Sequence, residues 1–165
     1  MLHKVNIAGL AMDPASNTPI VILKTEGEEQ TIPIWIGLLE ATSIASAMKN
    51  INYDRPMTHD LFKNFMGLLH IEISKVEICD IRANTYYAEI LFQSKEGTFT
   101  MDARPSDAIA MALRFNAPLY VDDKVIQKSK TEEGEVEVLD DSEEGKKWAE
   151  YLEKLSPDEF GKYKV

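Results

Sequence analysis

The stretch DARPSDAIAMALRFNAPLYV, residues 102–121, places polar and turn-forming residues directly before an apolar helical pattern. Alternation at the end of a strand puts Asp102 and Arg104 on one side, and Asp107 can reach the same place one helical turn later. An arginine between two carboxylates forms either an ion-pair network or a site in which the guanidinium binds phosphate and the carboxylates bind a metal ion. Both interpretations stay open on these residues alone.

The same residues also have a purely structural interpretation as the start of a helix. Ser106 can cap the helix by accepting a backbone hydrogen bond, and Pro105 stiffens the entry. Asp107 in the first turn is stabilised by the helix dipole by about 0.3–1 kcal/mol. Capping does not account for Asp102 and Arg104, so these two side chains keep the site interpretation open.

A second segment, RPMTHDL at residues 55–61, repeats the order of arginine, proline, hydroxyl and acid. Thr58 is the predicted N-cap of a helix over residues 58–70. His59 and Asp60 are adjacent, so they point about 100° apart on a helix and cannot both face one ligand closely. A lone histidine at a helix start is more often solvated or hydrogen-bonded than catalytic. A role for His59 as a base is the alternative.

Glu40 follows the strand-like PIWIG, where Gly37 lets the backbone turn into a helix. An acid in the first turn is favoured by the helix dipole. At an offset of 67 residues Glu40 aligns with Asp107, and both are followed by alanine. If a duplication explains this offset, the two acids begin equivalent helices and can meet as a carboxylate pair that a divalent cation bridges. Chance similarity between amphipathic segments is the alternative.

Hydrophobic periodicity divides the chain into two halves, each with three strands followed by a helix. The predicted strands are residues 2–12, 20–25, 31–37, 71–82, 84–93 and 97–103, with a short strand at 116–122. The predicted helices are residues 38–51, 58–70 and 105–115. The second of these helices has a predicted apolar stripe of Leu61, Phe62, Phe65 and Leu69. The pattern predicts an α+β fold, a mixed or antiparallel sheet with packed helices, with the β-β-β-α unit as the candidate duplication.

Length and charge indicate one domain over residues 1–128, followed by an acidic C-terminal segment over residues 129–165 with a short helix near its end. The formal net charge of the chain is −10. The C-terminal segment, with 12 acidic and 6 basic residues, accounts for −6 of it. Such acidity counts against a protein that binds nucleic acid through a broad basic surface, and counts less against a metal-dependent nuclease. Phosphate loops, nucleophile elbows, dinucleotide fingerprints and zinc spacings are absent from the sequence.

No apolar run is long enough for a membrane helix, and the N-terminus lacks the features of a signal peptide. The single cysteine, Cys79, cannot form an internal disulfide. A cytoplasmic protein with no membrane partner is therefore expected.

Five segments, in matching order, resemble the bifunctional nuclease domain family: SNTPIVIL, IPIWIGLLEATSIA, RPMTHDL, NTYYAEI and DARPSDAIAMALR. The resemblance covers about residues 3–128. It implies an α+β fold known mostly from bacterial proteins of uncharacterised role, and a metal-aided phosphodiester hydrolase that is often homodimeric. The family name comes from plant members described as cleaving both DNA and RNA. The motifs carry over to Glu40, Arg55, His59, Asp60, Asp102, Arg104, Ser106 and Asp107.

The first functional interpretation is a nuclease that cleaves DNA, RNA or both. The predicted ligands of Mg²⁺ or Mn²⁺ are Glu40, Asp102 and Asp107. Arg104 is expected to stabilise charge on the phosphoryl oxygens, with Arg55 and Ser106 as further substrate-binding residues. The expected catalytic residues are His59, Asp60, Arg104 and Asp107, with His59 or Asp60 assisting proton transfer.

Two other functions stay open. One is a non-catalytic regulatory or assembly domain of a homo-oligomer, with a dimer favoured. The other is a module that binds an anion or small molecule at its helix N-termini.

Overall fold

The computed structural model describes residues 1–27 and 30–132. These residues form one sheet of seven strands and four helices, which confirms the predicted α+β class. The strands are β1 (Leu2–Asp13), β2 (Thr18–Thr25), β3 (Thr31–Trp35), β4 (Glu72–Arg82), β5 (Thr85–Ser94), β6 (Gly97–Ala103) and β7 (Leu119–Asp122). The helices are α1 (Leu38–Met48), α2 (Thr58–Leu68), α3 (Pro105–Phe115) and α4 (Asp123–Glu132).

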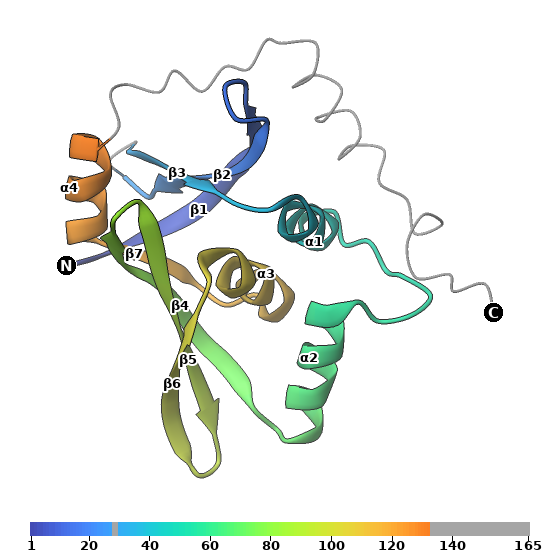
Figure 1. Cartoon of the computed structure of the whole chain (residues 1–165). Coiled ribbons are helices and arrows are strands. Elements are labelled where there is room, and N and C mark those ends of the chain that lie inside the picture. The colour runs from blue at the N-terminus through green and yellow to red at the C-terminus, as the bar shows by residue number, and fades with distance from the viewer. Residues whose placement is uncertain (28–29, 133–165) are drawn as a thin grey trace.

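The sheet has the strand order β3-β2-β1-β7-β4-β5-β6 (Figure 1). Neighbouring strands are antiparallel except for β4 and β7, which pair in parallel. Two three-stranded meanders, β1–β3 and β4–β6, therefore flank β7, and each is followed in the chain by a helix. This is the predicted strand-and-helix order. Pro33 lies in β3 at one edge of the sheet, where a missing backbone donor is tolerated.

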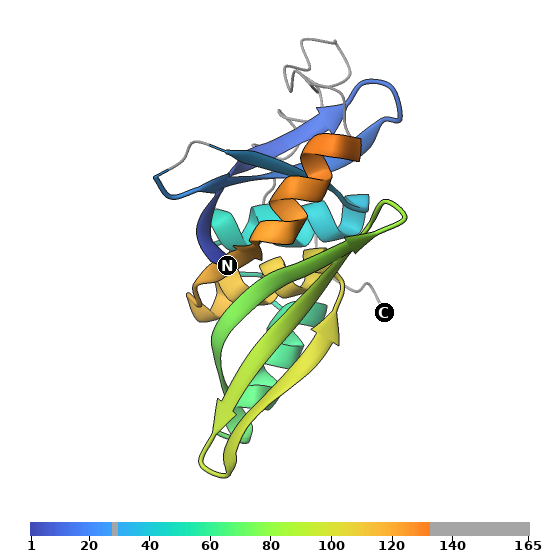
Figure 2. The same ribbon diagram turned by 90° about the vertical axis from the view of Figure 1, so that its left-hand side faces the viewer.

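The helices cover both faces of the sheet. Figure 2 shows α4 in front of the strands, with α1, α2 and α3 behind them. The main core lies between the strands and the α1 and α3 helices, and its fully buried members include Leu23, Ile44, Ile78, Ile109 and Met111. None of the helices in the described part of the chain is long and apolar enough to cross a membrane.

The predicted cap of α3 is wrong. Ser106 does not precede the helix; the N-cap position belongs to Arg104, and no side chain makes a capping hydrogen bond there. The reason is Pro105, which takes the first helical position because it has no backbone N–H to satisfy. Ser106 is consequently inside the helix, and it is buried.

The predicted cap of α2 is also wrong. Thr58 is the first helical residue, and Met57 occupies the N-cap position. The backbone N–H of Met57 donates to the carboxylate of Asp60 at 3.1 Å, so the acid three residues into the turn closes the helix start. A hydroxyl next to a helix start is thus a weaker signal here than the acid that follows it.

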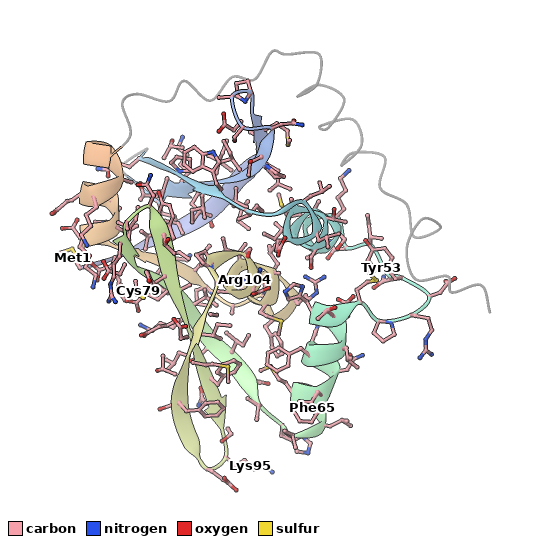
Figure 3. The ribbon with its side chains drawn as sticks, viewed as in Figure 1. Met1, Tyr53, Phe65, Cys79, Lys95 and Arg104 are labelled. Carbon is pink, nitrogen blue, oxygen red and sulfur yellow. The ribbon has the colours of Figure 1, made fainter. Side chains whose placement is uncertain are left out.

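The predicted apolar stripe of α2 lies on the surface and not in the core. Met66 is the buried residue of this helix, whereas the four stripe residues are all exposed. Phe65, on α2 in Figure 3, has 54% of its surface exposed. Periodicity identifies an apolar face correctly, but it does not identify what covers that face.

The α4 helix was not predicted, because the sequence after β7 is rich in charge. Two apolar residues, Val125 and Ile126, are nevertheless buried against the sheet. Asp122 accepts the backbone N–H of Lys124 at 2.9 Å and so supports the helix start. The short helix predicted near the C-terminal end lies outside the described residues.

A nearly buried carboxylate, Asp80 of β4, ties α4 to the sheet. It accepts hydrogen bonds from Lys128 Nζ at 2.9 Å and from Arg82 Nε at 2.7 Å. The hydrogen bond from Lys128, with that from Arg82 next, holds the pKa of Asp80 well below its usual range. A lowered folded-state pKa adds stability above the unfolded value of about 3.9, and this stability is lost as pH falls toward the folded value.

We therefore expect Asp80→Asn to lower the melting temperature clearly at pH 7 and to lower it less at pH 3. Thermal unfolding followed by circular dichroism at both pH values measures the two differences. Glu96→Gln, the same chemical change at the exposed β5–β6 turn, is the control and should have little effect at either pH. An equal loss for Asp80→Asn at pH 7 and pH 3 would contradict the charge argument.

Candidate active site

Arg104 lies between two carboxylates where α1 and α3 begin (Figure 3). Its Nε and one terminal nitrogen donate to the two oxygens of Asp107 at 2.7 and 3.1 Å. Its other terminal nitrogen donates to Glu40 Oε1 at 2.9 Å. Glu40 is in the first turn of α1 and Asp107 is in the first turn of α3. The two acids aligned by the 67-residue offset do therefore meet, but they meet at a guanidinium.

Small residues let the two helix starts come together. Ala41 and Ala108, which follow the two acids, are completely buried. At the start of α1, a Cβ added to Gly37 would collide with the carboxylate of Glu40. The φ angle of Gly37 is −74°, an ordinary value, so glycine is needed here for space and not for backbone conformation.

His59 joins this cluster from the start of α2. Its Nε2 lies 2.9 Å from Asp107 Oδ1, and its Nδ1 lies 2.8 Å from Ser43 Oγ on α1. A carboxylate can only accept hydrogen bonds, so Nε2 carries the hydrogen that Asp107 accepts. In the neutral ring Nδ1 then has the lone pair and accepts the hydroxyl hydrogen of Ser43. Three helices thus contribute one residue each to a Ser43–His59–Asp107 chain.

Opposing effects set the charge state of Asp107. Partial burial alone would raise the pKa of its carboxyl, but hydrogen bonds from Arg104 and then from His59 outweigh this and hold the pKa below its usual value. The hydrogen bonds to Asp107 raise the pKa of Arg104 in return. The Arg104–Asp107 pair is therefore fully ionised at neutral pH, and Asp107 can orient the imidazole as a carboxylate.

Asp60 belongs to a different ion pair. Its Oδ1 accepts Arg114 Nε at 2.6 Å, while its other oxygen accepts the N–H of Met57. Arg114, only 6% exposed, also donates to the backbone carbonyls of Ser43 and Ala110. This arginine therefore connects α3 to both α1 and α2, and it fixes the backbone at Ser43. His59 and Asp60 therefore point to different partners, as their adjacent positions on a helix predicted.

Two cavities meet at the Glu40–Arg104 pair. The first, called here the His59 cavity, has a volume of about 300 Å³, and its lining includes Ser43, Tyr53, His59 and Asp107. The second, the Ser106 cavity, has about 290 Å³ and lies toward Trp35 and Tyr86. Glu40 and Arg104 line both cavities. The hydrogen-bonded chain from Ser43 to Arg104 therefore lines the His59 cavity.

The sequence profile of the bifunctional nuclease domain family matches residues 21–134, which include every member of this cluster. The chain belongs to that family. The predicted site residues Glu40, His59, Arg104 and Asp107 all lie within the matched region.

Members of the family and other relatives show how far the similarity extends. An uncharacterised protein of Mycobacterium tuberculosis is 32% identical over 96% of this chain and 98% of its own length. Bifunctional nuclease 2 of Oryza sativa subsp. japonica is 30% identical over 70% of this chain, and bifunctional nuclease 1 of Arabidopsis thaliana is 28% identical over 73%. The similarity covers 37% and 38% of these two plant proteins, respectively.

Four of the predicted site residues do not line the His59 cavity, and one of them is Asp60, which pairs with Arg114. Asp102 is exposed on β6, opposite Glu89 of β5. Arg55 is exposed in the loop between α1 and α2, and neither residue lines either cavity. Ser106 lines the second cavity only. The strand alternation that placed Asp102 beside Arg104 fails because β6 ends at Ala103.

The three residues predicted to bind a cation do not form one group in the structure. Within residues 1–27 and 30–132, no group of three or more His, Cys, Asp or Glu side chains could hold a metal ion. Glu40 and Asp107 bind Arg104, and Asp102 is on the exposed strand. A metal bound between Glu40 and Asp107 would have to displace the guanidinium.

Two functional candidates were missed at the level of sequence, namely Ser43 and Arg114. Ser43 lies three residues after Glu40, and Arg114 lies seven residues after Asp107, so each shares a helix face with an acid already singled out. That spacing was the available signal. It is weak, since it is also met by many residues that do no chemistry.

Proposed function

We propose that this chain hydrolyses phosphodiester bonds of nucleic acid in the His59 cavity. The observation that carries the proposal is the hydrogen-bonded chain of Arg104, Asp107 and His59 along one wall of that cavity. Membership of the bifunctional nuclease domain family, and relatives named bifunctional nuclease, support the choice of substrate.

Arg104 is the group best suited to bind the phosphate. Three of its five N–H bonds donate to Glu40 and Asp107, which leaves two for oxygens of a substrate. The side chain is 65% exposed, so a phosphate can reach it without rearrangement of the fold. A guanidinium fixed in this way stabilises negative charge that develops on phosphoryl oxygens.

His59 supplies the proton transfer. Asp107 holds the Nε2 hydrogen, so the basic atom is Nδ1, which lies beside the Ser43 hydroxyl. Proton transfer in the cavity therefore passes through this nitrogen. Asp107 also stabilises the imidazolium that forms when Nδ1 accepts a proton.

The chain offers little electrostatic attraction to a long nucleic acid. Its formal net charge is −10, and Glu40 and Asp107 add negative charge beside Arg104. Few counterions can be released on binding, so affinity should depend only weakly on salt. The proposal therefore favours short or single-stranded substrates that are bound weakly.

We expect His59→Ala to lower cleavage of oligonucleotides by about 10²- to 10⁴-fold, the usual contribution of a general acid or base. The assay follows single-stranded and duplex DNA and RNA with highly purified full-length protein. The control is His3→Ala, because His3 also pairs with an aspartate, Asp123, at 3.1 Å and is equally buried.

Equal activity of the His59→Ala and His3→Ala proteins would overturn the proposed site. Oligonucleotide binding without cleavage by the wild-type protein would assign the cavity to anion binding instead.

The divalent cation is kept as a separate proposal, with Glu40 and Asp107 as its two candidate ligands. The same assay in EDTA, Mg²⁺ and Mn²⁺ tests it. Cleavage that is lost in EDTA and restored by a cation would support it. Cleavage that is unchanged in EDTA would leave Arg104 as the group that balances the phosphate charge.

A second function, assembly of a homo-oligomer, is favoured by the exposed face of α2. Five large apolar side chains are exposed on this helix and the residue after it: Leu61, Phe62, Phe65, Leu68 and Leu69. A contiguous apolar surface of this kind is characteristic of an interface between proteins. A symmetric dimer would bury one such face against its equivalent.

We expect Phe65→Glu to convert a dimer into a monomer, because a charge at the centre of an apolar interface is left unpaired. Size-exclusion chromatography with light scattering measures the mass. Asn64→Glu places the same charge on an exposed polar position of α2 and should leave the mass unchanged. A wild-type protein that is monomeric at all concentrations tested would contradict the assembly proposal.

A further inference from the structure

We propose that Ser43 is the nucleophile of the His59 cavity and that it attacks the phosphorus of phosphoesters to form a covalent phosphoseryl intermediate. The inference deepens the proposed function and rests on it for the choice of phosphodiester substrates. The activation of Ser43 itself rests only on the geometry of the cavity.

The hydroxyl of Ser43 differs from the other two hydroxyls of α1. Thr42 Oγ1 donates to the carbonyl of Leu38 at 3.0 Å, and Ser46 Oγ donates to the carbonyl of Ser43 at 2.9 Å. Both are the ordinary bonds that a hydroxyl makes to its own helix backbone. Ser43 Oγ instead lies 2.8 Å from the imidazole of His59. Its hydroxyl therefore makes a contact between α1 and α2 and not a hydrogen bond to the backbone of its own helix.

The order of the three groups is that of an activated serine. Asp107 accepts the Nε2 hydrogen of His59, which leaves the lone pair of Nδ1 directed at the Ser43 hydroxyl. The imidazole can therefore take the hydroxyl proton as Oγ forms a new bond. Both distances, 2.9 and 2.8 Å, are within the range required of a nucleophile, its base and the group that orients the base.

The cavity also contains a group that can stabilise the attacked phosphate. Ser43 and Glu40 are three residues apart on α1, so they share a helix face, and Glu40 holds the guanidinium of Arg104. Ser43 and Arg104 both line the His59 cavity. A phosphoryl group on Oγ would thus share the cavity with Arg104, whose remaining N–H bonds can donate to its non-bridging oxygens.

The reaction has two balanced steps. In the first, Ser43 Oγ forms a bond to phosphorus, the bond from phosphorus to the leaving oxygen breaks, and the hydroxyl proton moves to His59 Nδ1. The leaving oxygen lies opposite Oγ, so it takes a proton from solvent while His59 releases one to solvent. In the second, the oxygen of a water molecule bonds to phosphorus and the Oγ–phosphorus bond breaks. This water also lies opposite Oγ, so it loses its proton to solvent, while Ser43 Oγ takes a proton from His59 Nδ1, which has accepted one from solvent.

The test uses a fluorophosphonate, which needs no nucleic acid. Attack by Ser43 Oγ breaks the phosphorus–fluorine bond, releases fluoride, and transfers the hydroxyl proton to His59 Nδ1. We expect the full-length protein to gain one phosphonyl group, located on Ser43 by peptide mass spectrometry. Labelling should be absent in Ser43→Ala, at least 100-fold slower in His59→Ala, and unchanged in Ser74→Ala, whose hydroxyl donates to the carbonyl of Leu91 at 3.1 Å and which lines neither cavity.

The labelling rate at different pH values separates activation from a structural role. An activated Ser43 gives a rate that falls as His59 becomes protonated, and this dependence disappears in His59→Ala. Ser43→Cys is a second variant, and its thiol should react with iodoacetamide faster when His59 is present. If another residue were labelled, or if no residue were labelled in a folded wild-type protein, the proposal that Ser43 is the nucleophile would be overturned.

Oligonucleotide cleavage keeps the two proposals distinct. Labelled Ser43 without cleavage means that the nuclease proposal fails while the nucleophile stands. Cleavage that persists in Ser43→Ala, with no labelling of the wild-type protein, means that the nucleophile fails while the nuclease proposal stands.

Discussion

Asp107→Asn is expected to lower cleavage by about 10³- to 10⁴-fold while the fold is retained. The amide has the shape of the carboxylate, but it can donate a hydrogen bond. If it donates to His59 Nε2, the ring hydrogen moves to Nδ1, and Nδ1 can no longer accept a proton from the cavity. A tautomer change of this kind costs about 10⁴-fold in a serine protease.

The measurement is the rate of oligonucleotide cleavage beside the rate of fluorophosphonate labelling, with melting temperatures for every variant. Asp123→Asn is the matched control, since Asp123 is the carboxylate of the other His–Asp pair and lies outside the cavity. If Asp107→Asn kept cleavage within twofold of the wild-type rate, the orientation of His59 by Asp107 would have no part in the chemistry.

Local signals in the sequence were sufficient for most of the architecture. The strand β6 and the helix α3 have the predicted bounds, and the two halves follow the predicted order of strands and helix. Apolar residues recur at every second position in a strand and at every third or fourth position in a helix when one face is buried. Most strands and helices here bury one face in the same core, so both patterns are strong. The helix α4 was missed because its two buried apolar residues, Val125 and Ile126, are adjacent in a highly charged segment.

The offset of 67 residues predicted that Glu40 and Asp107 could meet, and they share a partner in the structure. What the offset could not give is the identity of that partner. A carboxylate pair can be neutralised by a cation or by a guanidinium, and composition alone does not distinguish them. Arg104 lies close to both carboxylates because Pro105 begins α3. The arginine is therefore in the N-cap position, outside the alternation of β6.

The remaining parts of the site depend on how helices pack. His59 is held by residues 16 and 48 positions away in the chain, Ser43 and Asp107, and no local pattern encodes contacts of that kind. The same limit explains the buried Arg114, whose partner Asp60 is 54 positions away. The contacts of His59 and the Asp60–Arg114 pair both form because α1 and α2 each pack against α3.

Arg104→Ala is expected to lower cleavage by about 10²- to 10³-fold, the usual cost of removing a donor that stabilises the charge of a transition state. The loss of folding stability should be small. Arg104 is largely exposed, and exposed ion pairs contribute about 0–1 kcal/mol. Arg82→Ala is the control, because Arg82 is 67% exposed and donates through its Nε to Asp80 at 2.7 Å, away from the cavity. It should leave cleavage unchanged.

The pH profile of Arg104→Ala gives a second and independent result. Without the hydrogen bonds from Arg104, His59 alone opposes the effect of burial and the pKa of Asp107 rises, so the ionised form that orients His59 is lost at a higher pH. The acid limb of the residual activity should therefore move to higher pH. Arg104→Lys keeps the charge but not the fork that binds both oxygens of Asp107, so it should restore only part of the activity and of the shift. If cleavage by Arg104→Ala were equal to wild type in Mn²⁺ and absent in EDTA, a cation between Glu40 and Asp107 would be doing the work assigned here to the guanidinium.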